Sequence, residues 1–191
     1  MKFGTQKAGF TLVELLITLA VFAVLMAVAA PNFTAYQRNA ELTSITNSLI
    51  AALNASRGEA MKRGRYAMVI PADKENWSSG WVAFVDIDRT QDFDESKDIR
   101  IVARDAVPAY ITVAGNNGSS AASPPYVMFD PVGYPKTKKD GFSAVSISIA
   151  RNDVSSDQID AETRRIIISN AGRVRSCKPS TDSTCTSKAI Q

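Results

Sequence analysis

A group of positively charged side chains lies near the C-terminus, over residues 162–178. This stretch holds one acid, Glu162, and five cations: Arg164, Arg165, Arg173, Arg175 and Lys178. Guanidinium groups bind phosphate through paired hydrogen bonds, so cations at this density could hold a nucleic-acid backbone without reading its sequence. The alternative is an exposed basic strand edge, which would discourage aggregation or pair with acids of a neighbouring protein.

The basic stretch reads as two strands joined by a tight turn. Residues 164–169 predict the first strand, residues 170–172 the turn, and residues 173–176 the returning strand. Gly172 supplies the positive φ that such a turn often needs. Side chains alternate along a strand, so Arg173 and Arg175 are expected on one face, about 6.7 Å apart, with Val174 on the other.

Two cysteines, Cys177 and Cys185, follow this hairpin, and the residues between them are polar and rich in Ser and Thr. If the chain is exported they should form a disulfide, whereas in the cytosol they would stay free thiols. A closed loop this short would stabilise the fold by about 2.5 kcal/mol in the loop-entropy model. The bond would clasp the end of the basic hairpin.

The absence of histidine from the sequence argues against an enzyme. Histidine is the commonest general base and a usual zinc ligand, and no Ser and Lys arrangement replaces it as a nucleophile with its base. Lys and Arg total 22 against 19 Asp and Glu, a net charge of +3, so overall charge says little about partners. We therefore expect binding or assembly, with no catalytic residue and no cofactor.

Five acids crowd a short stretch of the chain: Asp86, Asp88, Asp92, Asp94 and Glu95. Oxygen ligands at alternate positions suit calcium. However, the sixth and twelfth positions counted from Asp86 are Gln91 and Lys97, where an EF-hand loop has Gly and Glu. We favour a solvated hairpin tip, neutralised in part by Arg89, Lys97 and Arg100, and expect no metal.

Three aromatic residues, Trp77, Trp81 and Phe84, precede these acids. Aromatic faces stack on bases and sugars, so the three could form a binding platform. Such residues on a strand more often pack in the core or against a helix. We favour the core interpretation.

A long apolar segment lies ahead of all these residues. From Phe10 to Ala30 the only charged residue is Glu14. Residues 10–30 would span about 31 Å as a helix, which matches a bilayer core. Lys2 and Lys7 precede the segment, so the bulk of the chain is expected to cross the membrane. An A-x-A pattern at residues 27–29 fits a cleaved signal peptide instead, but Glu14 would then cost a few kcal/mol on insertion without any gain.

Residues 9–14, Gly-Phe-Thr-Leu-Val-Glu, resemble the processing site of type IV pilins and type II secretion pseudopilins. In that family a prepilin peptidase cuts after the glycine and methylates the new N-terminus. The resemblance implies that Gly9 ends a leader, that Phe10 begins the mature chain, and that the Glu14 carboxylate pairs with the freed amine of Phe10. Such a pair would offset the cost of burying both charges and would set the axial register between subunits.

The predicted helix continues beyond the apolar segment. Apolar and small side chains recur at spacings of three and four, at Leu42, Ile45, Leu49, Leu53, Ser56 and Ala60. Gly64 is a plausible C-terminal cap, and Pro31 should bend the helix. We expect one bent helix over residues 10–63, of which 10–30 lie in the membrane or filament core and 31–63 form an amphipathic half packed on a domain.

After Gly64 the apolar period changes to two. Strands are expected at residues 66–70, 81–85, 99–103, 110–113, 127–129, 143–150 and 164–169. Residues 115–125, rich in Gly, Asn, Ser and Pro, read as an exposed flexible loop. The pattern predicts an α+β fold in which a long N-terminal helix packs on an antiparallel sheet or pair of sheets. The expected parts are a leader (1–9), the helix (10–63) and a globular β domain (64–191).

Two further stretches narrow the resemblance. Residues 77–88, a Gly-Trp strand leading into acids, are similar to the GspH/FimT branch of minor pilins and pseudopilins, which implies a type IV pilin fold. Residues 172–175, Gly-Arg-Val-Arg, resemble the Gly-Arg-x-Arg motif of FimT-type minor pilins linked to DNA capture. FimU-type pilins, whose role is assembly, look alike in this region. Carried over by position, the motif implies that DNA is bound by Arg173 and Arg175, with support from Lys178, Arg164 and Arg165.

The resemblance implies a minor pilin of a bacterial type IV pilus. Such a subunit is made as a single-pass prepilin in the inner membrane, with a periplasmic domain, and then enters the filament at or near its tip on the cell surface. The implied partners are the prepilin peptidase, other major and minor pilins, and double-stranded DNA, bound without sequence specificity in natural transformation. The alternative is a FimU-like pilin that primes assembly, or a GspH-like type II secretion pseudopilin, without DNA binding.

Overall fold

The computed structural model describes residues 9–188 of the chain, except for the side chains of residues 28–32. Most of the expected leader, residues 1–8, therefore lies outside the described residues. Contacts between residues divide the chain into two compact units, residues 1–40 and residues 41–191. All the strands belong to the second unit.

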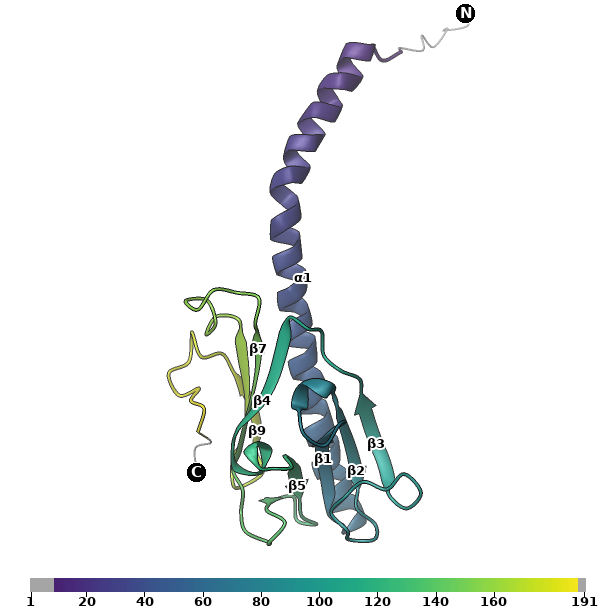
Figure 1. Ribbon diagram of the computed structural model, residues 1–191, viewed down its shortest axis with the longest axis vertical. Helices are drawn as coiled ribbons and strands as arrows, with labels where there is room; N and C mark the ends of the chain where they lie inside the picture. Colours follow the sequence, from purple (N-terminus) through teal and green to yellow (C-terminus); the bar gives the residue numbers. More distant parts are fainter. Residues whose placement is uncertain (1–8, 189–191) are drawn as a thin grey trace, which may run out of the picture. The chain divides into compact units, whose positions relative to one another are not determined.

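One helix, α1 (Leu12–Arg63), runs without interruption through 52 residues, including Pro31 (Figure 1). In the first unit its apolar side chains are exposed, as at Leu16, Phe22 and Leu25. Over the described residues, the structure has no helix of sufficient length and apolar character to cross a bilayer. The membrane span expected over residues 10–30 therefore stays a prediction.

The second half of α1 confirms the expected apolar stripe. All six predicted positions from Leu42 to Ala60 are buried, because they form one face of the helix and pack into the core. The helix ends as expected at Gly64, which has a left-handed φ of 63°. Arg65 N donates to Ala60 O at 3.2 Å and closes the last turn.

Nine strands form two antiparallel sheets around this stripe (Figure 1). The five-stranded sheet has the order β3-β2-β1-β5-β6, with strands β1 (Ala67–Pro71), β2 (Trp81–Val85), β3 (Ile99–Arg104), β5 (Val127–Phe129) and β6 (Pro135–Lys136). The four-stranded sheet has the order β4-β7-β8-β9, with strands β4 (Ile111–Asn117), β7 (Val145–Arg151), β8 (Thr163–Ile168) and β9 (Val174–Cys177). The α+β prediction is confirmed, with a pair of sheets.

The predicted strands are all present, most of them with ends shifted by one or two residues. The sequence analysis missed β6, which has only two residues, and a 3-10 helix, η1 (Trp77–Ser79). The core interpretation of the aromatic residues is confirmed. Trp77, Trp81 and Phe84 are at most 2 % exposed, and Trp77 Nε1 donates to Ser120 O at 3.0 Å.

The expectation of an exposed flexible loop over residues 115–125 is wrong in its first half. Strand β4 extends to Asn117, a 3-10 helix, η2 (Gly118–Ala121), follows, and Ser119 and Ser120 are buried. The polar segment can be buried because its groups find partners: Ser120 Oγ donates to Ser146 O at 2.9 Å, and Ser119 N donates to Ser143 Oγ at 3.0 Å.

Candidate functional site

The predicted basic hairpin forms from β8 and β9. Ile168 pairs with Val174, Ile167 with Arg175, and Arg165 with Cys177. Gly172 N donates to Ser169 O at 2.8 Å to close the turn, and Ser169 N donates to Arg173 O at 3.1 Å. The hairpin lies at the β9 edge of the four-stranded sheet.

Gly172 meets two requirements at once. Its φ is 78°, a left-handed conformation that favours glycine, and an added Cβ would lie 2.2 Å from Gly133 O. Arg57, on α1, donates from Nε to the same Gly133 oxygen at 2.9 Å. The turn is therefore seated against the Gly133 backbone and Arg57. Sequence reasoning missed these two residues, because nothing in their local pattern links them to the hairpin.

Val174 faces the core, as the predicted alternation requires, and the two arginines beside it differ in their surroundings. The Arg173 side chain is exposed and has no hydrogen bond or ion pair within residues 9–188. Arg175 is half-buried, with Nη1 at 3.3 Å from Asp182 Oδ2 and Nη2 donating to Thr184 O at 3.3 Å.

The predicted disulfide between Cys177 and Cys185 is formed. The loop that it closes is fixed to the sheet by two arginines. Arg165 donates from Nε to Ser148 Oγ at 3.0 Å and from Nη1 to the carbonyl oxygen of Cys185. Arg175 holds Asp182 and Thr184 of the same loop. Part of the positive charge seen in the sequence therefore stabilises the C-terminal loop.

Asp182 is a further residue of the site that the sequence analysis did not identify. Hydrogen bonds from the hydroxyl and backbone N–H of Thr184, followed by Arg175, hold the pKa of the Asp182 carboxyl below its ordinary value. The carboxylate is therefore charged at neutral pH, and in this structure it pairs with Arg175. Its position seven residues after Arg175, across a disulfide loop, gives no sequence signal.

The remaining cations also differ from one another. Arg164 Nη1 donates to Ala161 O and to Thr163 O, each at 3.1 Å, so its guanidinium binds the protein itself. The Lys178 side chain is half-buried and has no hydrogen bond or ion pair among the residues that the structure describes. Of the five predicted cations, Arg173 and Lys178 are thus the two without a partner in that part of the chain.

The acidic stretch is solvated at Asp92 and Glu95, as expected, but not at Asp86. Asp86 is fully buried, and its carboxylate accepts hydrogen bonds from Thr90 N at 3.1 Å and Gln91 N at 3.0 Å. Asp98 in the same way accepts from Ile87 N and Asp94 N, each at 2.9 Å. Burial raises the pKa of the Asp86 carboxyl. These carboxylates fold the loop, because they satisfy its backbone N–H groups.

Cations pair with the exposed acids of this loop. Lys97 Nζ lies 3.3 Å from carboxylate oxygens of both Asp88 and Asp94, and Arg100 Nη1 lies 3.2 Å from Glu95 Oε1. The expected neutralisation by Lys97 and Arg100 is confirmed. Asp86, Asp88 and Asp98 each offer an oxygen within 4.8 Å of the others. An acidic cluster whose oxygens already accept backbone hydrogen bonds gives no ground for a metal site.

At the N-terminus of α1, Glu14 has a local partner. Its carboxylate accepts hydrogen bonds from Thr11 N at 3.0 Å and Thr11 Oγ1 at 3.1 Å, while Glu14 N donates to Thr11 Oγ1 at 3.2 Å. This reciprocal arrangement is a capping box, which sequence reasoning overlooked in the pattern T-x-x-E. Gly9 and Phe10 precede it and are exposed.

Comparison with protein families gives two matches. Residues 46–172 match the family described as type II transport protein GspH. Residues 5–30 match the prokaryotic N-terminal methylation motif. The first match covers most of the second unit, including the acidic loop and the Gly172 turn.

Individual proteins are similar as well. The type IV major pilin protein PilA of Myxococcus xanthus is 32% identical over 66 residues, which are 35% of this chain and 30% of that protein. The chain thus spans about a third of this relative's length. Among solved structures, two crystal forms of the type IV minor pilin FimU of Pseudomonas aeruginosa are similar in fold. Their TM-scores are 0.53 and 0.50, at 22% and 20% identity, over 77% and 72% of this chain and 95% and 94% of theirs.

Proposed function

The chain belongs to the GspH family of minor pilins and pseudopilins, and from this premise we propose that it works in a type IV pilus and binds DNA through its basic hairpin. Proteins of this family are structural subunits rather than enzymes. The proposed ligand is double-stranded extracellular DNA, held without sequence specificity at or near the filament tip during natural transformation.

The observation that carries the DNA proposal is the exposed, unpaired guanidinium of Arg173 beside a rigid turn. Gly172 seats the turn against Gly133 and Arg57, so Arg173 extends from a fixed backbone. A preorganised cation loses less conformational freedom when it binds a phosphate than a cation on a flexible loop does. Guanidinium forks also match phosphate oxygens in geometry.

Two neighbours in sequence complete the proposed phosphate-binding set. Lys178 is a second cation without a partner among the described residues. Arg175 would contribute by exchanging Asp182 for a phosphate, because the 3.3 Å pair is partly solvent-exposed and therefore weak. Arg164 and Arg165 would add to the local positive potential while they keep their contacts with the protein.

The experiment that tests this proposal is the DNA affinity of a soluble fragment, residues 34–191, measured against salt concentration by fluorescence anisotropy. Three phosphate contacts predict a slope of log affinity against log salt of about −2.7. Arg173→Gln should weaken binding several-fold and make the slope shallower by about 0.9, since one fewer counterion is released.

Lys139→Gln is the matched control, since Lys139 is also exposed and without a partner within residues 9–188. It removes one positive charge from another part of the surface. Equal losses of DNA affinity in the two variants, or no DNA binding at low salt, would mean that the hairpin has only a structural role.

The N-terminal region supports a second part of the proposal. We place the cleavage between Gly9 and Phe10, where a prepilin peptidase would act and methylate Phe10. The exposed apolar side chains of the first half of α1 need a cover, which the inner membrane would supply before assembly and other pilins afterwards. Glu14 would pair with the N-terminal amine of a subunit there.

Assembly without DNA binding is the second candidate function, and the position of Glu14 at the start of this apolar surface favours it. Glu14→Ala should leave the leader cleaved but reduce the subunit's amount in sheared pili, because the amine loses its partner. Thr11→Ala is the control, since it removes the capping hydroxyl and keeps the carboxylate. Normal incorporation of the Glu14→Ala chain would show that the carboxylate serves only as a helix cap.

A further inference from the structure

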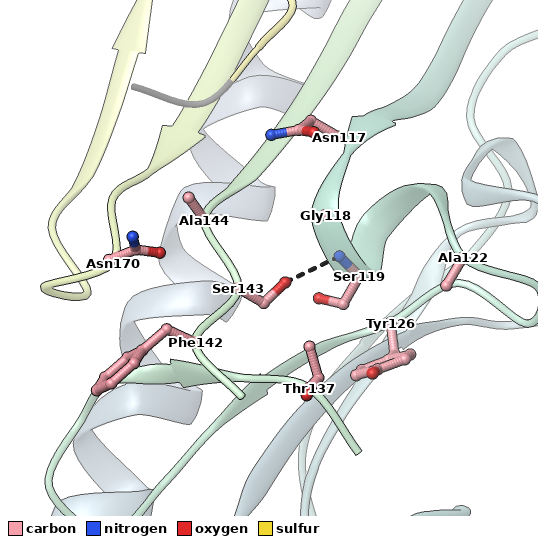
Figure 2. Close-up of a pocket in the computed structure, with 10 residues that line it drawn as sticks. All are labelled: Asn117, Gly118, Ser119, Ala122, Tyr126, Thr137, Phe142, Ser143, Ala144 and Asn170. Atoms are coloured by element: carbon pink, nitrogen blue, oxygen red, sulfur yellow. Dashed lines mark hydrogen bonds between the residues drawn. The ribbon is translucent and has the colours of Figure 1, made fainter. Parts of the chain in front are cut away.

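A polar pocket opens beside the turn of the basic hairpin, and neither of the proposed functions uses it. Its volume is about 430 Å³, within the range of about 300–1,000 Å³ that is usual for small-molecule sites. The walls come from the end of β4, from η2, and from the segments before β5 and β7. Figure 2 shows Asn170, from the hairpin turn, on the opposite side from Tyr126 and Ala122.

Among residues 9–188, no charged side chain lines this pocket. Six neutral polar side chains do: Asn117, Ser119, Tyr126, Thr137, Ser143 and Asn170. Phosphates and carboxylates are recognised by cations, so a neutral lining selects against them. The lining instead offers hydroxyl and amide groups, each of which can both donate and accept hydrogen bonds.

Three of the hydroxyls are oriented by the protein backbone. The oxygens of Ser143, Thr137 and Tyr126 accept hydrogen bonds from Ser119 N, Gly141 N and Lys138 N at 3.0, 2.9 and 2.8 Å. Their own hydrogens have no acceptor among residues 9–188. Their oxygens are therefore held in position, and each hydroxyl keeps a hydrogen to donate.

The hydroxyl of Ser119 adds a second, independent observation. Ser119 is 4 % exposed, and its Oγ is buried without a hydrogen-bond partner in the part of the chain that the structure describes. In Figure 2 this oxygen lies between Ser143 and Tyr126, shielded from the solvent in the pocket, so a ligand would reach it after rotation of the Ser119 side chain about χ1. Gly118 precedes Ser119 and has a φ of 63°, and a Cβ there would collide with Ala144 O. The position therefore requires glycine, and the backbone that carries the Ser119 hydroxyl is fixed. A buried hydroxyl left unpaired is unfavourable unless a ligand satisfies it.

An exposed aromatic ring stands at the rim. Phe142 is 60 % exposed, and its ring is held by Tyr134, edge-on at 5.7 Å, and by Lys136 Nζ at 4.1 Å. Ring faces carry partial negative charge and attract the C–H groups on the apolar side of a sugar ring. A fixed aromatic ring beside several neutral hydroxyls and amides suits a ligand with one apolar face and many hydroxyl groups.

We propose that this pocket binds a neutral pyranose residue of a glycan. The hydroxyls of Ser143, Thr137 and Tyr126 would donate hydrogen bonds to sugar oxygens. The side-chain amides of Asn170 and Asn117 would form hydrogen bonds with sugar hydroxyls and so distinguish their positions on the ring. Phe142 would cover the C–H face of the sugar. The site is separate from the proposed DNA contacts, because Arg173 and Lys178 do not line it. A pilus subunit with both features would bind glycans and DNA independently.

The test uses the full chain in a detergent without a sugar head group. Saturation-transfer NMR is recorded with three probes, the methyl glycosides of glucose, galactose and mannose, and with thymidine and acetate for comparison. We expect at least one neutral glycoside to bind saturably, and acetate not to bind. Binding of thymidine alone would overturn the proposal in favour of a nucleoside site, and no binding of any glycoside would also overturn it.

Ser119→Ala is the most informative variant. Removal of an unpaired buried hydroxyl should leave the melting temperature unchanged or raise it, while the glycoside affinity falls at least fivefold. Ser146→Ala is the matched control, because Ser146 Oγ is likewise buried without a hydrogen-bond partner among the described residues but does not line the pocket. Equal glycoside affinities for the two variants would overturn the proposal.

A second pair of variants tests the aromatic rim. Phe142→Ala should weaken glycoside binding at least fivefold, whereas Phe33→Ala, which removes an equally exposed ring from α1, should not. Unchanged glycoside binding by Phe142→Ala would overturn the proposal, because the ring is its contact with the C–H face of the sugar. A DNA affinity that stays the same in all four variants separates this site from the hairpin.

Discussion

The acidic loop between β2 and β3 and the basic hairpin of β8 and β9 each concentrate charges of one sign, but they use these charges differently. In the acidic loop, Asp86 and Asp98 accept backbone hydrogen bonds, and Lys97 and Arg100 pair with the exposed acids. In the basic hairpin, Arg173 has no partner within residues 9–188.

The difference teaches that a run of like charges becomes a binding site only where the fold leaves some of them unpaired. The two regions look similar in sequence, since both place several ionised groups around a turn. The acidic loop contains short acidic side chains close to many backbone N–H groups. Its carboxylates therefore find hydrogen-bond donors within the loop. The arginine side chain carries only hydrogen-bond donors, so it needs an oxygen from elsewhere as acceptor. Asp182 supplies one to Arg175, whereas nothing in the described chain supplies one to Arg173.

The largest expected effect comes from the buried end of the acidic loop. Asp86→Ala would leave the N–H group of Gln91 without its acceptor and the N–H group of Thr90 with only its longer bond, 3.3 Å to Asp88 Oδ1. We expect the free energy of unfolding to fall by about 2–3 kcal/mol. Urea denaturation of residues 34–191 measures it, with Asp92→Ala as the control at an exposed acid of the same loop. Similar small losses in both variants would mean that the loop is the solvated tip suggested by its sequence.

Much of the fold was predictable because it depends on local periodicity. The stripe at Leu42, Ile45 and Leu49 and the alternation around Val174 follow from residue spacing alone. Strand β6 was missed because two residues carry no periodicity. The burial of Ser119 was missed because it depends on the hydroxyl of Ser143, 24 residues away.

The site was predictable only in part. The hairpin, the Gly172 turn and the disulfide follow from local sequence, and all are present. Which arginines stay unpaired depends on Asp182, folded back by the disulfide loop, and on carbonyl groups of distant segments. Composition counts charges but contains no information on such long-range partners.

A moderate effect is expected when Arg175 is released from its internal partner. Asp182→Asn removes the charge from the carboxylate but keeps an oxygen that accepts from Thr184 N and Oγ1. Arg175 would then be free for phosphate, and DNA affinity should rise roughly fivefold, about 1 kcal/mol. Fluorescence anisotropy at fixed salt measures the change.

The control for this variant is Asp105→Asn, which removes an exposed acid outside the hairpin. A rise of equal size in both variants would mean that the gain comes from net charge. A fall in affinity for Asp182→Asn would indicate that Arg175 acts by ordering the disulfide loop, which would move its role from DNA contact to support of Arg173.

The smallest effect is expected at the paired cation of the acidic loop. Arg100 is exposed and pairs with Glu95, itself exposed, so Arg100→Gln should change the free energy of unfolding by no more than about 0.5 kcal/mol. It removes the same charge as Arg173→Gln but from a self-paired region, so the salt slope of DNA binding should stay as in the unmodified fragment. A slope made shallower by the same amount in both variants would mean that DNA is attracted by the whole surface. A slope that changes only for Arg173→Gln would establish that the unpaired state of a cation, rather than its presence, defines the site.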